Sequence, residues 1–302
     1  MKPETSRFDA RDIDPSLVRS LVADQFPAWA GLAVRAAEPQ GHDNRTFRLG
    51  EHMAVRLPSH AGYVAQIAKE QTWLPRLAPQ LPLPIPTPIA AGVPGCGYPW
   101  PWSVYRWLEG RAARKDRIRN LAQFARDVAG FLAALRRIDP VGGPPAGPHS
   151  FGRGGPLATY DGQTREAIAK LGDAIDGGAA AEVWDAALAA PATGAPVWFH
   201  GDIAVNNLLL DERGRLAAVI DFGCSGVGDP ACDLVLAWTL LDGDDRAAFQ
   251  AAVGLDPGAW ARARGWALWK ALIVCAAGRG RADGEGSLRV IEAVVAEHRS
   301  AA

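Results

Sequence analysis

The chain has 302 residues, which is enough for one large domain or two ordinary ones with a well-buried core. Its hydrophobic content of 48% and charged content of 22% are typical of a globular protein and exclude an intrinsically disordered chain. With a formal net charge of -1, the whole chain offers no electrostatic basis for binding nucleic acid or an anionic membrane.

The sequence patterns predict neither export nor membrane insertion. The N-terminal segment, MKPETSRFDARDIDPS, is charged and lacks the apolar run of a secretory signal. The apolar stretch GWALWKALIVCAAG (265–278) is too short for a membrane span and carries Lys270, so we predict a core helix there. The four cysteines have no CxxC spacing, and we expect reduced core residues. These features together predict a cytoplasmic protein.

The first part of the chain is predicted to be rich in strands. A short helix is expected at 14–26, with Asp14 as its N-cap and Pro15 in its first position. A longer helix is expected at 63–78, and the alternating prolines of 81–88 favour an extended connector. Patterns typical of strands occur at residues 46–50, 52–58, 89–93 and 102–108.

After Gly110 the pattern becomes mainly helical. Helices are expected at 117–138, near 162–175 and 179–190, and from Pro230 to the C-terminus, and a Pro/Gly loop occupies 141–156. A hairpin at 197–223 interrupts them. We therefore predict an α+β, two-lobed chain: a small β-rich lobe at 1–108, a strand-like hinge at 103–110, and a larger helical lobe at 109–302.

Polar residues mark the open end of the predicted hairpin. Gly214 supplies the turn conformation. If Leu210 lies opposite Leu216, Asn207 lies opposite Val219. The register therefore predicts that the residues just before and just after these two strands emerge together.

Three oxygen-bearing side chains are thereby brought to one place. Asp221 follows the second strand by about 7 Å, and Asp202 lies in the loop that precedes Asn207. Asn and Asp oxygens suit magnesium, and a further carboxylate can accept a proton from an attacking hydroxyl. One base and two metal ligands are the groups that phosphoryl transfer needs, which favours catalysis over three turn-capping residues.

The pattern HGDIAVNN…IDFG resembles the catalytic segment of the aminoglycoside phosphotransferase family, relatives of the eukaryotic protein kinases. The resemblance implies a protein-kinase-like fold, Asp202 as catalytic base, and Asn207 and Asp221 as magnesium ligands. His200 is expected to pack behind the loop. In GVGDPACDLVLAW (226–238), Asp229 caps a helix that begins at Pro230, and the resemblance implies that Asp233 braces the catalytic loop.

The resemblance extends to the N-terminal lobe. GHDNRTFRLG (41–50), which contains Asn44, stands where the family has its phosphate-covering loop, although only the first glycine is present. Arg56 replaces the phosphate-binding lysine of the kinases, and Glu70 is the acid expected to pair with it. The backbone of Tyr105, Arg106 and Trp107 in the hinge strand is expected to bind adenine. The resemblance thus implies ATP and Mg²⁺ as cofactors.

These observations predict an ATP-dependent O-phosphotransferase that moves the γ-phosphoryl group to a hydroxyl of a small molecule. An aminoglycoside antibiotic is one candidate acceptor; a sugar, an amino alcohol and a macrolide are others. A polycationic acceptor needs acids, and the helical lobe offers Asp161, Asp173, Asp176, Glu182 and Asp185. The choice of acceptor, the choice between ATP and GTP, and the oligomeric state stay open.

Two other kinds of protein share parts of this pattern. A protein kinase is disfavoured because only a few residues separate Asp221 from the helix at Pro230, leaving no room for a long activation segment. A nucleotide-binding pseudokinase is suggested by Arg56 and by the missing glycines, but the intact Asp202 and Asn207 argue against it. Neither nucleic acid nor membrane is expected as a partner.

Overall fold

The computed structural model describes residues 8–278 and 281–301, except for the side chains of 281–284 and 301. The first seven residues of the charged N-terminus therefore lie outside the described part. The chain divides into two compact units, Met1–Gln80 with Pro84–Glu109 and Leu81–Leu83 with Gly110–Ala302. The first contains a β-sheet and the second is mainly helical, so the fold is α+β, as the sequence predicted. The predicted division was directly after Leu108.

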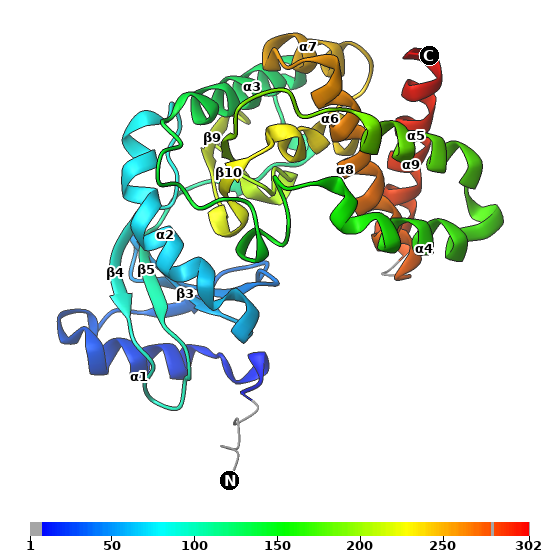
Figure 1. The fold of residues 1–302 in the computed structure, drawn as a ribbon. Coiled ribbons are helices and arrows are strands. Elements are labelled where there is room, and N and C mark those ends of the chain that lie inside the picture. Colours follow the sequence, from blue (N-terminus) through cyan, green and yellow to red (C-terminus); the bar gives the residue numbers. More distant parts are fainter. Residues whose placement is uncertain (1–7, 279–280, 302) are drawn as a thin grey trace. The chain divides into compact units, whose positions relative to one another are not determined.

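The first unit is built on a five-stranded antiparallel sheet with strand order β1-β2-β3-β5-β4, of which Figure 1 labels β3, β4 and β5. Two helices accompany it, α1 (Pro15–Gln25) and α2 (Val64–Leu77). Asp14 caps α1 by accepting hydrogen bonds from the backbone N–H groups of Ser16 and Leu17. The strands are β1 (Val34–Ala36), β2 (Asn44–Leu49), β3 (Met53–Pro58), β4 (Pro88–Gly92) and β5 (Trp102–Arg106).

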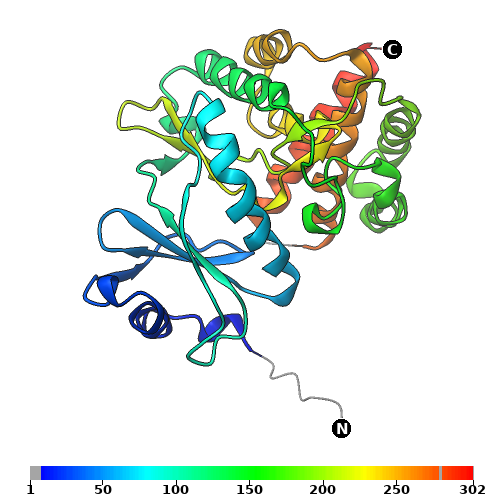
Figure 2. The same ribbon diagram turned by 60° about the vertical axis from the view of Figure 1, so that its left-hand side comes forward.

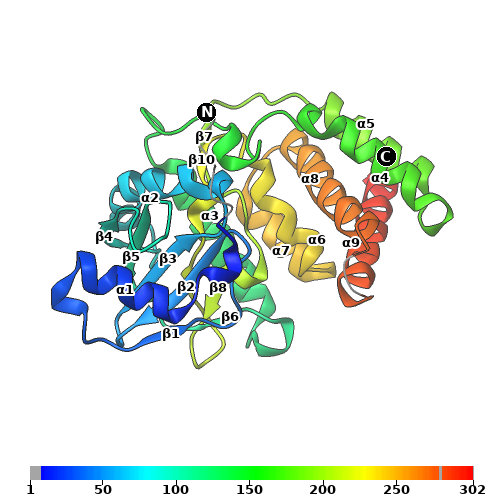
Figure 3. The same ribbon diagram turned by 90° about the horizontal axis from the view of Figure 1, so that it is seen from below.

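The two faces of this sheet have different roles because side chains alternate along a strand. On β3, Val55 and Leu57 are fully buried in an apolar core that also contains Leu21 of α1. Arg56 points to the other face, where Glu70 of α2 contacts it. Figures 2 and 3 show α1 and α2 against the sheet. The alternation therefore places one charged pair on the α2 face.

The second unit contains seven α-helices and two small sheets among its described residues, and the long helix α8 packs against α4, α5 and α9 (Figure 3). The helices are α3 (Leu121–Arg137), α4 (Asp161–Leu171), α5 (Gly177–Ala189), α6 (Leu236–Thr239), α7 (Gly243–Val253), α8 (Pro257–Ala276) and α9 (Arg281–Ala301). The strands are β6 (Arg111–Ala112), β7 (Val197–Phe199), β8 (Leu208–Leu210), β9 (Leu216–Val219) and β10 (Gly226–Gly228).

Differences from the predicted elements concern short or capped segments. Helix α3 begins at Leu121 and not at residue 117, because the Asn120 side chain caps it by accepting from the N–H of Gln123. The short strands β1, β6 and β10 were not predicted, since two or three residues carry too little periodic pattern. All four cysteines are free, but Cys96 is exposed and Cys275 is intermediate, so only two are core residues.

The segment at 265–278 forms the last part of α8, which ends at Ala276, and most of its residues up to Leu272 are buried, as predicted for a core helix. Trp266, Leu268 and Leu272 are nearly inaccessible, which is consistent with a helix surrounded by other helices. Among the described residues, no helix is both long enough and apolar enough to cross a membrane.

Candidate active site

The loop that carries Asp202 is held from behind by one buried carboxylate. Asp233 accepts hydrogen bonds from the backbone N–H groups of His200 (2.8 Å) and Gly201 (2.7 Å). Burial raises the pKa of Asp233, although these two N–H donors oppose the shift. Gly201 has φ +86°, and a Cβ on it would lie 2.7 Å from the carbonyl oxygen of Cys224, so the loop requires glycine here. Asp233 therefore braces the loop, in the place that the resemblance implied.

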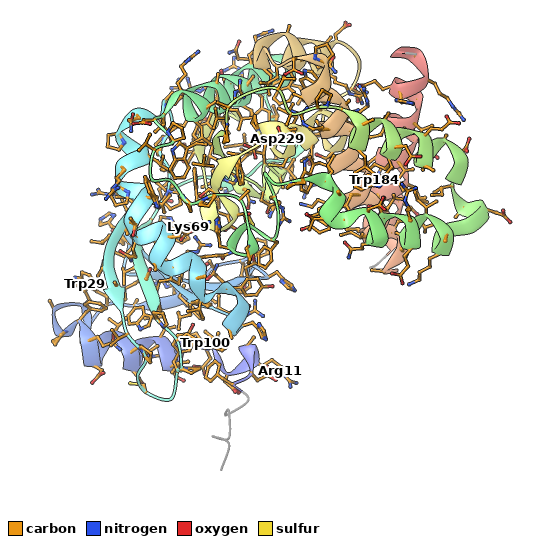
Figure 4. The ribbon with its side chains drawn as sticks, viewed as in Figure 1. Arg11, Trp29, Lys69, Trp100, Trp184 and Asp229 are labelled. Carbon is orange, nitrogen blue, oxygen red and sulfur yellow. The ribbon has the colours of Figure 1, made fainter. Side chains whose placement is uncertain are left out.

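Asp233 lies in a short helical segment, Pro230–Val235. The N-cap of this segment is Asp229, which Figure 4 labels. The Asp229 side chain accepts a hydrogen bond from the N–H of Ala231 and forms a buried ion pair with Arg262 of α8 at 2.6 Å. Asp229 is thus the predicted cap, and its ion pair also fixes this segment to α8.

His200 is fully buried and connects the loop to the hairpin. Its Nδ1 accepts the backbone N–H of Asp202 at 3.2 Å, which leaves Nε2 as the donor to the carbonyl of Ile220 at 3.1 Å. The ring contacts Phe222 edge-on at 4.5 Å between centroids. Both ring nitrogens are therefore used in holding the loop, and His200 packs behind it as predicted.

The hairpin has the predicted turn and nearly the predicted register. Gly214 has φ +72°, and Leu210 pairs with Leu216. Val219, however, pairs with Leu208 and not with Asn207, because the register shifts between Leu209 and Leu210. The prediction that Asn207 pairs with Val219 was therefore wrong by one residue.

Asp202 is held on both carboxylate oxygens. The amide nitrogen of Asn207 donates to Oδ2 at 3.0 Å and to the Asp202 carbonyl at 2.9 Å, and Lys270 Nζ lies 2.9 Å from Oδ1. Burial acts to raise the pKa of Asp202, but Lys270 and Arg153 outweigh it, and the pKa lies below its ordinary value. The carboxylate is therefore ionised, oriented and still 26% exposed.

Lys270 and Arg153 were missed as site residues by the sequence analysis. With Trp266 and Trp269 they line a pocket around the Asp202 carboxylate, and we call this the Asp202 pocket. The signal that could have found Lys270 was its position as a lone charge in the apolar run 265–278. No comparable signal marks Arg153, which lies in the Pro/Gly-rich loop.

Asn207 and Asp221, the predicted metal ligands, flank the two strands at the open end of the hairpin. The N–H of Ile220 donates to the Asn207 carbonyl at 2.8 Å, which joins the two positions across the hairpin end. Because the Asn207 amide nitrogen faces Asp202, its Oδ1 faces the other way, where Asn206 Nδ2 donates at 3.3 Å. Asp221 has left-handed backbone angles (φ 66°, ψ 67°), which are costly for a residue with a side chain and cluster at functional sites.

This donor set fits Mg²⁺. The described residues contain no group of three or more His, Cys, Asp or Glu side chains that could hold a metal. Magnesium does not need one, because it commonly takes one or two protein oxygens and completes its shell with waters and substrate phosphates. The amide oxygen of Asn207 and the carboxylate of Asp221 are ligands of that kind.

In the first unit, Arg56 and Glu70 meet on the α2 face of the sheet. Arg56 Nη1 lies 3.5 Å from both carboxylate oxygens of Glu70, and both side chains are largely buried. The Tyr105 hydroxyl donates to the same carboxylate, and its ring lies 5.6 Å from the Arg56 guanidinium carbon. Burial and the neighbouring Glu70 raise the pKa of Tyr105. The Tyr105 side chain therefore positions Glu70, a role that the sequence did not reveal.

The expected adenine-binding backbone is already partly engaged. The N–H of Arg106 donates to the Thr87 carbonyl at 2.9 Å, and the N–H of Trp107 donates to the His52 carbonyl at 2.8 Å. Asn44 is buried at the first residue of β2, and no described residue donates to its Oδ1. Among the residues predicted to bind nucleotide, Arg56 is therefore paired with Glu70. The N–H groups of Arg106 and Trp107 are hydrogen-bonded to backbone carbonyls of the protein.

Three of the five acids proposed for a polycationic acceptor have partners elsewhere in the unit. Arg165 binds both Asp161 and Asp185, and Asp161 also accepts from the indole N–H of Trp184, labelled in Figure 4. Asp176 caps α5 and binds Arg299. None of the five acids lines the Asp202 pocket.

A larger cavity of about 660 Å³ lies elsewhere in the second unit. Residues 154–158, the segment that precedes β7, and the Asp229–Arg262 ion pair contribute to its wall. Asp202, Asn207, Asp221 and Lys270 do not line it, so it is separate from the predicted chemistry.

Comparisons with solved structures identify similar folds. The structure is similar to that of the aminoglycoside phosphotransferase APH(2")-IIIa with GDP and kanamycin, with a TM-score of 0.73, 18% identity, and coverage of 93% of this chain and 98% of that one. It is also similar to the apoenzyme of macrolide 2'-phosphotransferase MphH from Brachybacterium faecium, with a TM-score of 0.58, 22% identity, and coverage of 92% and 97%.

At such identities the likeness establishes the fold, which is protein-kinase-like. No curated protein matches the chain. Residues 36–266 match the model of the phosphotransferase enzyme family, and this range includes Arg56, Glu70 and the whole catalytic hairpin. The chain therefore belongs to the phosphotransferase enzyme family.

Proposed function

We propose that this protein is an ATP-dependent O-phosphotransferase that transfers the γ-phosphoryl group to a hydroxyl of a small molecule. The observation that carries the proposal is the Asp202 carboxylate, which is ionised, held by Asn207 and Lys270, and still partly exposed. An acceptor hydroxyl within hydrogen-bond distance of it could give up its proton as the oxygen attacks phosphorus.

Roles toward the phosphate donor are assigned within each unit separately. Arg56 binds the α- and β-phosphates, and Glu70 holds it in place with help from Tyr105. Asn207 and Asp221 hold Mg²⁺, which when bound neutralises phosphate charge. Lys270 stabilises the ionised form of Asp202 and limits where the carboxylate can turn. Orientation and charge neutralisation are the main sources of rate in phosphoryl transfer.

The intact catalytic set also distinguishes this proposal from a pseudokinase. A chain that only bound nucleotide would have no need for a strained Asp221, a base oriented by two partners, and a buried Asp233 behind the loop. The described segment between Phe222 and Pro230 is short and ordered into β10, which leaves no long activation segment of a protein kinase.

The test is ATP-dependent phosphorylation of a panel of hydroxyl compounds by the full chain, including aminoglycosides, macrolides, sugars, amino alcohols and hydroxy acids. Product formation is followed by mass spectrometry and ADP release by a coupled assay. We expect turnover that needs magnesium and that Asp202→Asn abolishes. Transfer to a protein substrate without any small-molecule turnover would contradict the proposal.

A further inference from the structure

The Asp202 pocket contains a positive charge that the protein itself does not neutralise. Arg153 is half-buried, and its one hydrogen bond to a side chain is to the thiol of Cys224, at 3.5 Å. No described residue brings a carboxylate within 4.0 Å of its guanidinium, and Asp202 attracts it only from further away. A guanidinium stays charged inside proteins, so Arg153 provides donors and charge for an anion.

The other charges of this pocket do not compensate for Arg153. Lys270 and Asp202 form one ion pair, so their charges cancel and the pocket keeps a net charge of one positive unit. The helix α8, which supplies three pocket residues, carries Arg262, Arg264 and Lys270 but no acid. An acceptor that carries ammonium groups would therefore meet like charge and find no carboxylate except the base itself.

The uncharged part of the pocket wall includes two tryptophans that are packed among other side chains. The Trp269 ring lies 4.0 Å from that of Tyr160 between centroids, and its indole N–H donates to Gln163 at 2.8 Å. Trp266 meets Trp269 edge-on at 5.7 Å. Trp266 and Trp269 are themselves buried, so the groups of the pocket that reach its open side are the charged ones, Arg153, Asp202 and Lys270.

From this geometry we infer, on the basis of the proposed function, that the acceptor is a hydroxyl compound bearing an oxyanion, held by Arg153. The oxyanion is a carboxylate or a phosphate monoester, and the acceptor is not a polycation. Arg153 is then a specificity-determining residue, and Asp202 acts on a hydroxyl of the same molecule.

The experiment compares hydroxyl compounds of similar size and skeleton that differ in charge. Phenyllactate is set against its methyl ester and against phenylalaninol; glucuronate against glucose and glucosamine; and glycerate and glycerol phosphate against glycerol. Kanamycin serves as the polycation. Binding to the full chain is measured by calorimetry in the presence of a non-hydrolysable ATP analogue, and turnover by ADP release.

We expect the acid of a series to bind and react about tenfold to a hundredfold better than its neutral partner, and the amine to be worst. Arg153→Gln should abolish this preference without raising the Michaelis constant for ATP, whereas Arg153→Lys should keep part of it. Arg126→Gln, at an exposed position of α3, is the matched control. The glycerate and glycerol phosphate arms decide between carboxylate and phosphate.

Preference for the amines, efficient phosphorylation of kanamycin, or absence of binding by every acid would overturn the inference. So would an Arg153→Gln variant in which the Michaelis constant for ATP rises equally with all acceptors, because the guanidinium would then serve the nucleotide. If the acids bind in an Arg153-dependent way but nothing is phosphorylated, the proposed function fails while the anion site stands.

Discussion

Lys270 Nζ lies 2.9 Å from Oδ1 of Asp202, so a residue of a buried helix is ion-paired to the carboxylate assigned as the base. The ammonium and Arg153 together lower the pKa of Asp202 against the opposing effect of burial. A base with a lowered pKa is weak, yet it stays unprotonated in mildly acidic solution. Phosphoryl transfer through a loose transition state tolerates a weak base, since little proton transfer is needed before the phosphorus–oxygen bond breaks.

The first prediction concerns this ion pair. Lys270→Met removes the nearest cation, so the pKa of Asp202 should rise and the acid limb of kcat/KM against pH should move to higher pH. The direction of this shift follows from the lowered pKa, which keeps the Asp202 carboxylate ionised at lower pH. Without Lys270 the carboxylate becomes protonated at a higher pH, so activity is lost earlier as the pH falls. Lys115→Met, which breaks an exposed pair with Asp242, is the control. An unchanged acid limb would show that Lys270 does not tune the base.

The second prediction is for the base itself. Asp202→Asn should lower turnover by about 10²–10⁴ and leave the affinity for magnesium and ATP within a few-fold, because the carboxylate acts on the acceptor. Asp244→Asn, on the exposed start of α7, should have no effect. Turnover is measured by ADP release and the affinity for magnesium and ATP by calorimetry. An equal loss of nucleotide affinity would assign Asp202 to the donor side.

The third prediction is that Asp221→Ala weakens the complex of metal and nucleotide. Loss of a carboxylate ligand should remove most of the gain in ATP affinity that magnesium provides, while affinity without magnesium stays near that of the wild type. Titrations with and without the metal measure this directly. A variant with unaltered magnesium dependence would rule out the ligand assignment.

The fourth prediction concerns Arg56 and Glu70. Arg56→Ala should raise the Michaelis constant for ATP or lower turnover, and Glu70→Ala should have a similar effect because it releases the guanidinium. The double variant should be less impaired than the sum of the two, since both remove one shared interaction. Arg56→Lys should be partly active. Full activity in Arg56→Ala would refute the nucleotide role of this unit's charged pair.

The fifth prediction is for the stability of the catalytic loop. Asp233→Ala leaves the buried N–H groups of His200 and Gly201 without acceptors, and should lower the free energy of unfolding by about 1–3 kcal/mol. The loss is limited because burial of the Asp233 carboxylate is itself unfavourable, as its raised pKa indicates. Denaturant titration against Asp173→Ala, an exposed control, tests it. Equal stability of both variants would show that the brace is dispensable.

The sequence by itself determined the catalytic hairpin. Asp202, Asn207 and Asp221 lie close together along the chain, and one glycine turn with strand alternation suffices to bring them to one end. The same holds for Arg56 and Glu70, because a strand followed by a helix brings the guanidinium and the carboxylate together. Only the register beside Asn207 was missed, because a local bulge leaves no mark in the hydrophobic pattern.

Tertiary structure alone decided what surrounds the base. Helix α8 is apolar on most sides because other helices enclose it, so its sequence cannot show which turn faces Asp202. Lys270, Trp266 and Trp269 reach the pocket through the packing of α8, and Arg153 reaches it from an irregular loop without periodicity. The acids on α4 and α5 were available in the sequence, but their partners are set by helix packing, which directs them away from the pocket. Side-chain chemistry near the base therefore depends on contacts between segments distant in sequence, and only the folded chain determines them.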